Sequence, residues 1–246
     1  MSEPTKTEPD PSEHGHSPQE ISDRIGAPTG RGVLRDVVYG GIDGSVTTFA
    51  IVAGVAGAGL SPTIIVALGL ANVLADGFSM AAGNYSGTKA EVDNLMRLRQ
   101  VEERHIVKYP EGERGEVREI LRLKGLSGPV LEAATDAICA NHEAWINLMM
   151  EGEYGAGPVD PDPMRAAIAT FLAFLAAGMV PLVPFLFGLE TAFSLSVWLT
   201  LATFFGIGAL KSRWSLAPWW RSGFETLAIG GAAAALAYGV GSLFQL

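Results

Sequence analysis

Five long apolar stretches dominate this sequence, at roughly 37–60, 64–87, 166–188, 192–210 and 223–245. Each is long enough to cross a hydrocarbon core of about 30 Å as a helix, which takes about 20 residues. The chain shows no strand-like alternating runs, and unpaired backbone groups are not tolerated in lipid. The stretches therefore predict an all-α, polytopic membrane protein with five transmembrane helices.

The 17 Lys and Arg residues are confined to alternate gaps between these stretches. Four precede the first stretch, 10 lie at 88–165 and three lie at 211–221. The connections at 61–63 and 189–191 contain none. Because cytoplasmic loops are enriched in Lys and Arg, this pattern predicts a cytoplasmic N-terminus and a C-terminus outside.

The gaps also divide the chain into four parts. Residues 1–32 are rich in Pro, Glu, Ser and Gly, which predicts a disordered cytoplasmic tail. Residues 33–90 contain transmembrane helices 1 and 2, and residues 164–246 contain helices 3 to 5. Between them, residues 91–163 predict a cytoplasmic helical module that binds metal.

The module is expected to be a three-helix insertion between spans 2 and 3. Span 2 continues into it because no helix breaker appears before Pro110. A helix over 113–124 follows, closed by Gly125, and a third is predicted from Ser127 to about Gly152.

The acidic charge of the module limits the classes of partner that it can bind. Residues 91–162 contain 15 of the 26 carboxylates, and the chain has a net charge of −9. An acidic cytoplasmic module is expected to bind cations rather than anionic lipid, and the net charge argues against nucleic acid as a partner. The single cysteine, Cys139, excludes an internal disulfide.

Ionisable side chains inside membrane helices are costly, so each is a functional candidate. Asp43 lies about two turns into the first span, and Asp36 lies seven residues earlier on nearly the same face. In the second span, four side chains recur every four residues: Asn72, Asp76, Met80 and Asn84. Carboxylate and amide oxygens with a thioether suit Fe²⁺ or Mn²⁺, whereas Ca²⁺ or Mg²⁺ would not need the sulfur. The alternative is that the asparagines bond between helices and the methionine only packs.

Three ligand pairs in the module have i, i+3 spacing, which places both members on one helix face. They are Glu102/His105, Glu113/Glu116 and Met150/Glu153, with Met149 beside the third pair. Three helices could converge on a metal cluster, as in carboxylate-bridged di-iron bundles. The alternative is a solvated acidic surface with both methionines in the core.

Three motifs resemble the vacuolar iron transporter (VIT) family. They are Asp36-Val-Val-Tyr-Gly-Gly-Ile-Asp43-Gly, Ala75-Asp-Gly-Phe-Ser-Met80-Ala-Ala-Gly-Asn-Tyr, and the carboxylates followed by Met149-Met150-x-x-Glu153. Segments 208–211 and 219–226 look like the bacterial members of the family. The resemblance covers about 33–246.

The resemblance implies a five-span homodimer that exports Fe²⁺ from the cytoplasm in exchange for protons. It implies an ion path between the two copies, lined by spans 1 and 2, with mid-membrane ligands at Asp43 and Met80. It places the cytoplasmic metal-binding module on Glu102, His105, Glu113, Glu116, Met149, Met150 and Glu153. No prosthetic group is expected; Fe²⁺ or Mn²⁺ is the substrate, and Zn²⁺ is a further candidate for the module.

Two positions depart from the plant pattern, which has glutamate where this chain has Asn72 and His105. Asp76, one turn after the first of these, can take the place of that carboxylate. Histidine still binds Fe²⁺, Mn²⁺ and Zn²⁺ as the neutral ring, but it lowers the negative charge of the module.

Together these features predict a proton-coupled metal exporter rather than an enzyme. The bacterial-like C-terminal half and the absence of a targeting segment favour a prokaryotic plasma membrane, or a vacuolar membrane if the source is eukaryotic. One alternative is a membrane-bound di-iron ferroxidase, which needs two Glu-x-x-His motifs, whereas the module has one. The other is a metal sensor anchored by the spans, which would need no carboxylates inside the membrane.

Overall fold

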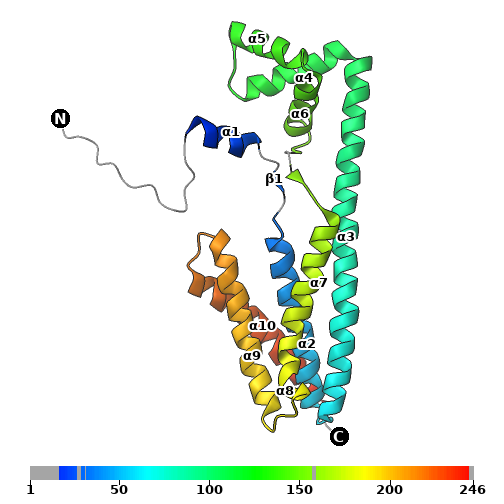
Figure 1. Ribbon diagram of the computed structural model, residues 1–246, viewed down its shortest axis with the longest axis vertical. Helices are drawn as coiled ribbons and strands as arrows, with labels where there is room; N and C mark the ends of the chain where they lie inside the picture. Colours follow the sequence, from blue (N-terminus) through cyan, green and yellow to red (C-terminus); the bar gives the residue numbers. More distant parts are fainter. Residues whose placement is uncertain (1–16, 27–28, 31, 157–158, 244–246) are drawn as a thin grey trace, which may run out of the picture. The chain divides into compact units, whose positions relative to one another are not determined.

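The computed structural model describes residues 17–26, 29–30, 32–156 and 159–243. The chain divides into two compact units (Figure 1). The membrane unit comprises residues 31–101 and 161–246, and the module unit comprises residues 102–160 with the N-terminal residues up to Gly30. The dividing point between residues 101 and 102 falls inside one continuous helix.

Among the described residues, five helical segments are long and apolar enough to cross a membrane. They are α2 (Leu34–Gly57), α3 (Pro62–Lys108), the segment of α7 (Pro163–Met179), η1 (Val180–Leu182) and α8 (Val183–Leu186), the segment of α9 (Ala192–Lys211) and η2 (Ser212–Trp214), and α10 (Trp219–Ser242). The predicted fold class is confirmed: the protein is a helical polytopic membrane protein.

Helices α2 and α7 pack backbone against backbone. A Cβ atom added to Gly40 would collide with the backbone of Thr170, and one added to Gly44 would collide with the backbone of Phe174. Small residues four apart let two membrane helices approach this closely. Helix α2 also packs against α9 and α10, and its Val52 is fully buried in the apolar core of this unit.

Helix α3 is unbroken from Pro62 to Lys108, as the lack of a helix breaker before Pro110 predicts. In the membrane unit it meets α7 and η1 through side chains. Gly77 faces the ring of Phe174, and Gly69 faces Leu182. Side chains therefore fill the space between α3 and its neighbours.

The third span loses its regular helix at its two prolines. Helix α7 ends at Met179, a 3₁₀ turn contains Pro181, and Pro184 lies in the short helix α8. Proline removes a helical hydrogen bond and frees carbonyl groups. The hydroxyl of Ser196 on α9 donates to the Pro181 carbonyl at 2.7 Å, so this carbonyl is paired inside the bundle.

The module unit contains the end of α3 followed by α4 (Pro110–Leu123), α5 (Gly128–Cys139) and α6 (His142–Gly152). Helix α4 begins at Pro110 rather than at residue 113, because proline is favoured in the first turn. The predicted third helix is two helices. Asn141 breaks it by accepting a hydrogen bond from the Ala144 N–H at 3.1 Å, which caps the start of α6.

Residues 18–26 form helix α1 (Pro18–Gly26), although the sequence predicts disorder across residues 1–32. The backbone N–H of Ser17 donates to Glu20 Oε2 at 3.0 Å, and the N–H of Glu20 donates to Ser17 Oγ at 3.3 Å. This reciprocal capping box explains the helix. Strand β1 (Thr29–Gly30) pairs in parallel with β2 (Val159–Asp160). Residues 1–16 of the expected tail lie outside the described residues.

Candidate functional site

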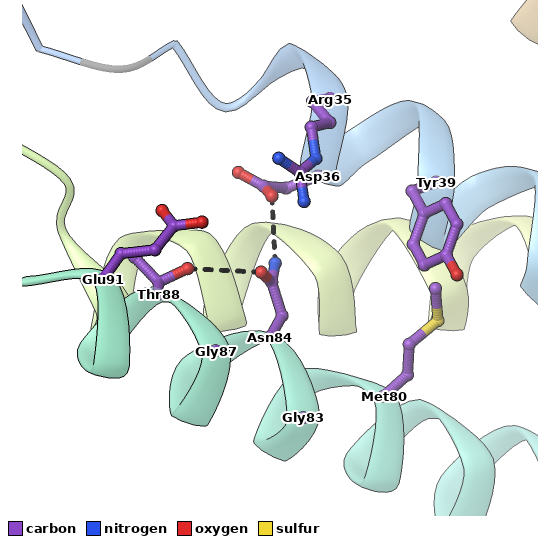
Figure 2. Close-up of a pocket in the computed structure, with 9 residues that line it drawn as sticks. All are labelled: Arg35, Asp36, Tyr39, Met80, Gly83, Asn84, Gly87, Thr88 and Glu91. Atoms are coloured by element: carbon purple, nitrogen blue, oxygen red, sulfur yellow. Dashed lines mark hydrogen bonds between the residues drawn. The ribbon is translucent and has the colours of Figure 1, made fainter. Parts of the chain in front are cut away.

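A pocket of about 410 Å³ opens between α2 and α3 in the membrane unit (Figure 2). It is lined from α2 by Arg35, Asp36 and Tyr39, and from α3 by Met80, Gly83, Asn84, Gly87, Thr88 and Glu91. The pocket thus offers carboxylate, amide and hydroxyl oxygens with one thioether sulfur. This donor set suits a first-row divalent cation.

Three of the predicted path residues meet in this pocket: Asp36, Met80 and Asn84. The Asn84 amide nitrogen donates to Asp36 Oδ1 at 2.9 Å. Figure 2 shows that the Met80 side chain lies on the same side of α3 as Asn84 and points toward Tyr39. The spacing of four residues on α3 therefore places a sulfur and an amide in one pocket with a carboxylate of α2.

The other three predicted path residues do not line the pocket. Asp43 is half-buried on α2, and Asp76 is exposed on α3, yet the two carboxylates are close enough for their charges to repel. Asn72 donates to Thr47 Oγ1 at 3.4 Å, and the Thr47 hydroxyl donates to the backbone carbonyl of Asp43 at 2.8 Å. Asn72 thus joins α3 to α2, which is the interhelical role that the sequence left open.

The module unit contains a second candidate site. One potential ligand atom from each of Glu102, His105 and Glu113 lies within 4.8 Å of the other two. His105 Nδ1 lies 3.3 Å from Glu113 Oε1. Glu102 and Glu113 are only 1% and 4% exposed, whereas His105 is half-exposed. A cation entering from the side of the histidine would meet two buried carboxylates.

The charges of these carboxylates are poorly compensated. Within the described residues, Glu102 Oε2 and Glu113 Oε2 are buried and have no hydrogen-bond partner. Burial, with the nearby carboxylates of Glu102 and Glu116, raises the pKa of Glu113 to about 7. Partial loss of water around its carboxylate and the charge of Glu102 also raise the pKa of Glu153. Buried like charges are stabilised by protons or by a bound cation, so the cluster is suited to hold a metal ion.

The remaining predicted module ligands are placed differently. Glu116 and Glu153 are exposed, but both carboxylates act electrostatically on Glu113. Met149 is fully buried and Met150 is 9% exposed. Both methionines therefore lie in the packed interior of the module, and the two exposed acids add negative charge beside the cluster.

Comparison with known sequences gives the family. The sequence pattern of the VIT family matches residues 34–242. The chain belongs to the VIT family. It is 34% identical over 218 residues to vacuolar iron transporter 1 of Oryza sativa subsp. japonica, covering 87% of this chain and 86% of the rice protein. It is 36% identical over 225 residues to the vacuolar iron transporter of Toxoplasma gondii, covering 87% of this chain and 74% of that protein.

The family match confirms the resemblance that the motifs indicate. It spans all nine residues that line the pocket and the three residues of the module cluster. Both candidate sites therefore belong to the part of the chain that is shared with the VIT family, whereas α1 lies before it.

One residue of the module site escapes the sequence patterns. The Tyr154 hydroxyl donates to Glu102 Oε1 at 2.7 Å. Burial and this hydrogen bond raise the pKa of Tyr154, so it acts as a neutral donor rather than as a phenolate ligand. The only indication in the sequence was that Tyr154 directly follows the predicted ligand Glu153. A single tyrosine after a helix end does not predict a hydrogen bond to a residue 52 positions away.

Proposed function

We propose that the protein is a proton-coupled exporter that moves Fe²⁺ from the cytoplasm across the membrane. VIT family members are transporters rather than enzymes, and the curated relatives are named vacuolar iron transporters. The observation that carries the proposal is the pocket in which Asp36, Met80 and Asn84 lie together between two membrane helices. A purely structural bundle has no need of a carboxylate and a thioether in one cavity.

The chemistry of the pocket favours iron as the cargo, with manganese as a second candidate. Fe²⁺ and Mn²⁺ both accept carboxylate and amide oxygens. The thioether of Met80 is a softer donor, and it stabilises Fe²⁺ more than the harder ions Ca²⁺ and Mg²⁺. The substrate is thus expected to be a first-row divalent cation rather than an alkaline-earth ion.

The module is proposed to collect the metal before it enters the membrane. Glu102, His105 and Glu113 form the binding site, and Glu116 and Glu153 raise the local cation concentration through their charge. The imidazole nitrogen also suits Zn²⁺, which could occupy the module without being transported.

Along the path, Asp36 is proposed to guide the ion into the pocket and Met80 to coordinate it. Asp43 and Asp76 would then alternate between metal and proton, because two nearby carboxylates cannot easily both stay charged inside a membrane. A two-fold homodimer would supply Asp43 and Met80 twice and so complete a four-ligand site at the interface.

The distribution of basic residues supports a cytoplasmic N-terminus and a C-terminus outside. The membrane is proposed to be a prokaryotic plasma membrane. In a eukaryotic source, it would be the vacuolar membrane.

Transport into sealed liposomes tests the proposal. Purified protein is reconstituted, and uptake of Fe²⁺, Mn²⁺, Zn²⁺ and Ca²⁺ is compared with and without an imposed pH gradient. We expect Fe²⁺ uptake that accelerates with the gradient, and no Ca²⁺ uptake. Equal rates with protein-free vesicles would exclude a transporter, while Fe²⁺ oxidation without uptake would favour the ferroxidase alternative.

A further inference from the structure

Asn84 connects three helices beside the pocket. Its amide nitrogen donates to Asp36 Oδ1 on α2 at 2.9 Å and to Thr170 Oγ1 on α7 at 2.7 Å. The carbonyl oxygen of Ala166 lies 3.3 Å from the same nitrogen. The amide oxygen accepts a hydrogen bond from the Thr88 hydroxyl at 3.4 Å, as Figure 2 shows.

These contacts are those of a positioning group rather than of a metal ligand. An asparagine binds a metal ion through its amide oxygen, and here that oxygen faces Thr88. Turning the amide over would place this oxygen against the carboxylate of Asp36, which offers no proton when it is ionised. The nitrogen is therefore held toward Asp36 by the charge of its partner.

We propose that Asn84 positions Asp36: it holds one carboxylate oxygen, so that the other faces the pocket as the ligand for an incoming divalent cation. This inference rests on the proposed function, in which Asp36 is the first membrane carboxylate that the cation meets. Holding a ligand in place before the ion arrives removes the cost of ordering it at the moment of binding.

The anchor behind Asn84 is rigid. Thr170 is fully buried, and its hydroxyl donates to the carbonyl of Ala166 at 2.9 Å, which fixes the oxygen that Asn84 contacts. Gly40 of α2 touches the backbone of the same threonine, only four residues from Asp36 along α2. The helix that carries the ligand and the side chain that orients it are therefore held against one point of α7.

Fe²⁺ uptake by liposomes, measured over a range of concentrations, separates positioning from ligation. Asn84→Asp keeps the shape but replaces the donor with a negatively charged oxygen. Positioning predicts that the half-saturating Fe²⁺ concentration rises about tenfold, the usual scale for a charge-assisted hydrogen bond. A direct ligand would be improved by the extra charge, so an unchanged or lower half-saturating concentration overturns the proposal.

A double-mutant cycle tests whether Asn84 acts through Asp36. Asn84→Ala is expected to raise the half-saturating concentration in the otherwise wild-type protein, and to have little further effect on Asp36→Asn protein. Equal increases in both backgrounds overturn the inference, because a merely structural role adds independently. This cycle also decides the question if the Asn84→Asp protein does not fold.

Thr226→Val is the matched control, because Thr226 is a buried membrane threonine whose hydroxyl donates to the Ser222 carbonyl within α10 at 3.1 Å, and its loss leaves Asn84, Asp36 and their contacts intact. We expect a lower melting temperature and a half-saturating concentration within about twofold of wild type. A rise as large as that of Asn84→Ala would show general loosening of the helices and overturn the proposal. Absence of uptake by the wild-type protein would instead overturn the proposed function, and this inference with it.

Discussion

The hydroxyl of Tyr154 donates a hydrogen bond to Glu102 Oε1 at 2.7 Å, while Glu102 Oε2 is buried and has no such partner in the described part of the chain. One oxygen of this carboxylate is therefore held, and the other is available to a cation. Donors that stand behind ligating carboxylates fix their orientation and raise metal affinity. The module site thus extends beyond the three residues whose ligand atoms cluster.

Replacing Tyr154 with phenylalanine tests this support. The ring is kept and the donor is lost, so we expect about tenfold weaker binding of Zn²⁺ or Mn²⁺ to the module, with little change in melting temperature. Calorimetric titration of the purified full-length protein measures it. Tyr109→Phe is the matched control, because the Tyr109 ring packs edge-on against His105 and that contact needs no hydroxyl. Equal affinities for both variants would contradict the role of Tyr154.

The pKa of Glu113, raised to about 7 by burial and by Glu102 and Glu116, predicts pH-dependent metal binding. Below about pH 7 this carboxyl holds a proton that a metal ion must displace. Well below this pH, we expect the metal affinity to fall by about tenfold for each pH unit. The Glu113→Gln protein should bind weakly at every pH. Titrations with Mn²⁺ at several pH values give the profile. A flat profile for the wild-type protein would show that Glu113 does not bind the ion.

Without metal, the raised pKa of Glu113 has the opposite effect on stability: a higher pH favours metal binding but disfavours the folded state. The folded chain keeps the Glu113 proton up to about pH 7, whereas the unfolded chain releases it near its ordinary pKa of 4.5. The folded state binds more protons in this interval, so stability should fall as the pH rises from 4.5 through about 7. Melting temperatures measured at several pH values with a chelator present check this direction. In the Glu113→Gln protein, the melting temperature should depend less on pH.

His105 is expected to set the preference of the module among metals. Its nitrogen favours Zn²⁺ over Mn²⁺, whereas a carboxylate favours Mn²⁺ relatively more. His105→Glu should lower the ratio of Zn²⁺ to Mn²⁺ affinity by about tenfold, as measured by competition titration. His142→Glu adds the same charge at an exposed position outside the cluster, and should leave the ratio unchanged. A similar change in both variants would mean that charge, rather than ligation, determines the preference.

Asp43 is expected to be required for flux but not for folding. Asp43→Asn keeps the shape and removes a half-buried charge, so the purified protein should melt at the same or a higher temperature. Fe²⁺ uptake by liposomes should be lost, because no charge replaces the hydration shell of the ion. Glu225→Gln changes an exposed carboxylate of α10 and should retain uptake. Wild-type transport by the Asp43→Asn protein would remove this residue from the path.

The five-span topology can be tested by labelling in a Cys139→Ser background. A cysteine at Lys89, which is half-exposed on α3, should react with an impermeant reagent only from the cytoplasm. A cysteine at Ser61, which is exposed between α2 and α3, should react only from outside. Labelling of both positions from the same side would contradict the arrangement.

Features that depend on many residues were predictable from the sequence. The apolar length of each span and the continuous α3 both follow from local composition. The features that escaped depend on single capping side chains. Asn141 splits one helix and Ser17 starts another, because one side chain can satisfy an open backbone N–H group and outweigh the surrounding pattern.

The candidate sites divide in the same way. Regular spacing placed Met80 and Asn84 on one face of α3, and both line the pocket. Spacing did not reveal that Asn84 contacts Thr170, or that Tyr154 contacts Glu102, because these partners lie 86 and 52 residues away and depend on how helices pack. Periodicity assigns a side chain to a face, and only tertiary structure gives that face its neighbour.

The glycine contacts of α2 bear on how a transport cycle could move. Backbone that touches backbone at Gly40 and Gly44 leaves no layer of side chains that could rearrange, so α2 and α7 should travel as one rigid body. Helix α3 is different, because the Phe174 ring and the Asn84 amide lie between it and that body, and side chains can change rotamer. We therefore expect alternating access to arise from α3 rocking against the rigid α2–α7 pair. This motion would open and close the pocket between α2 and α3.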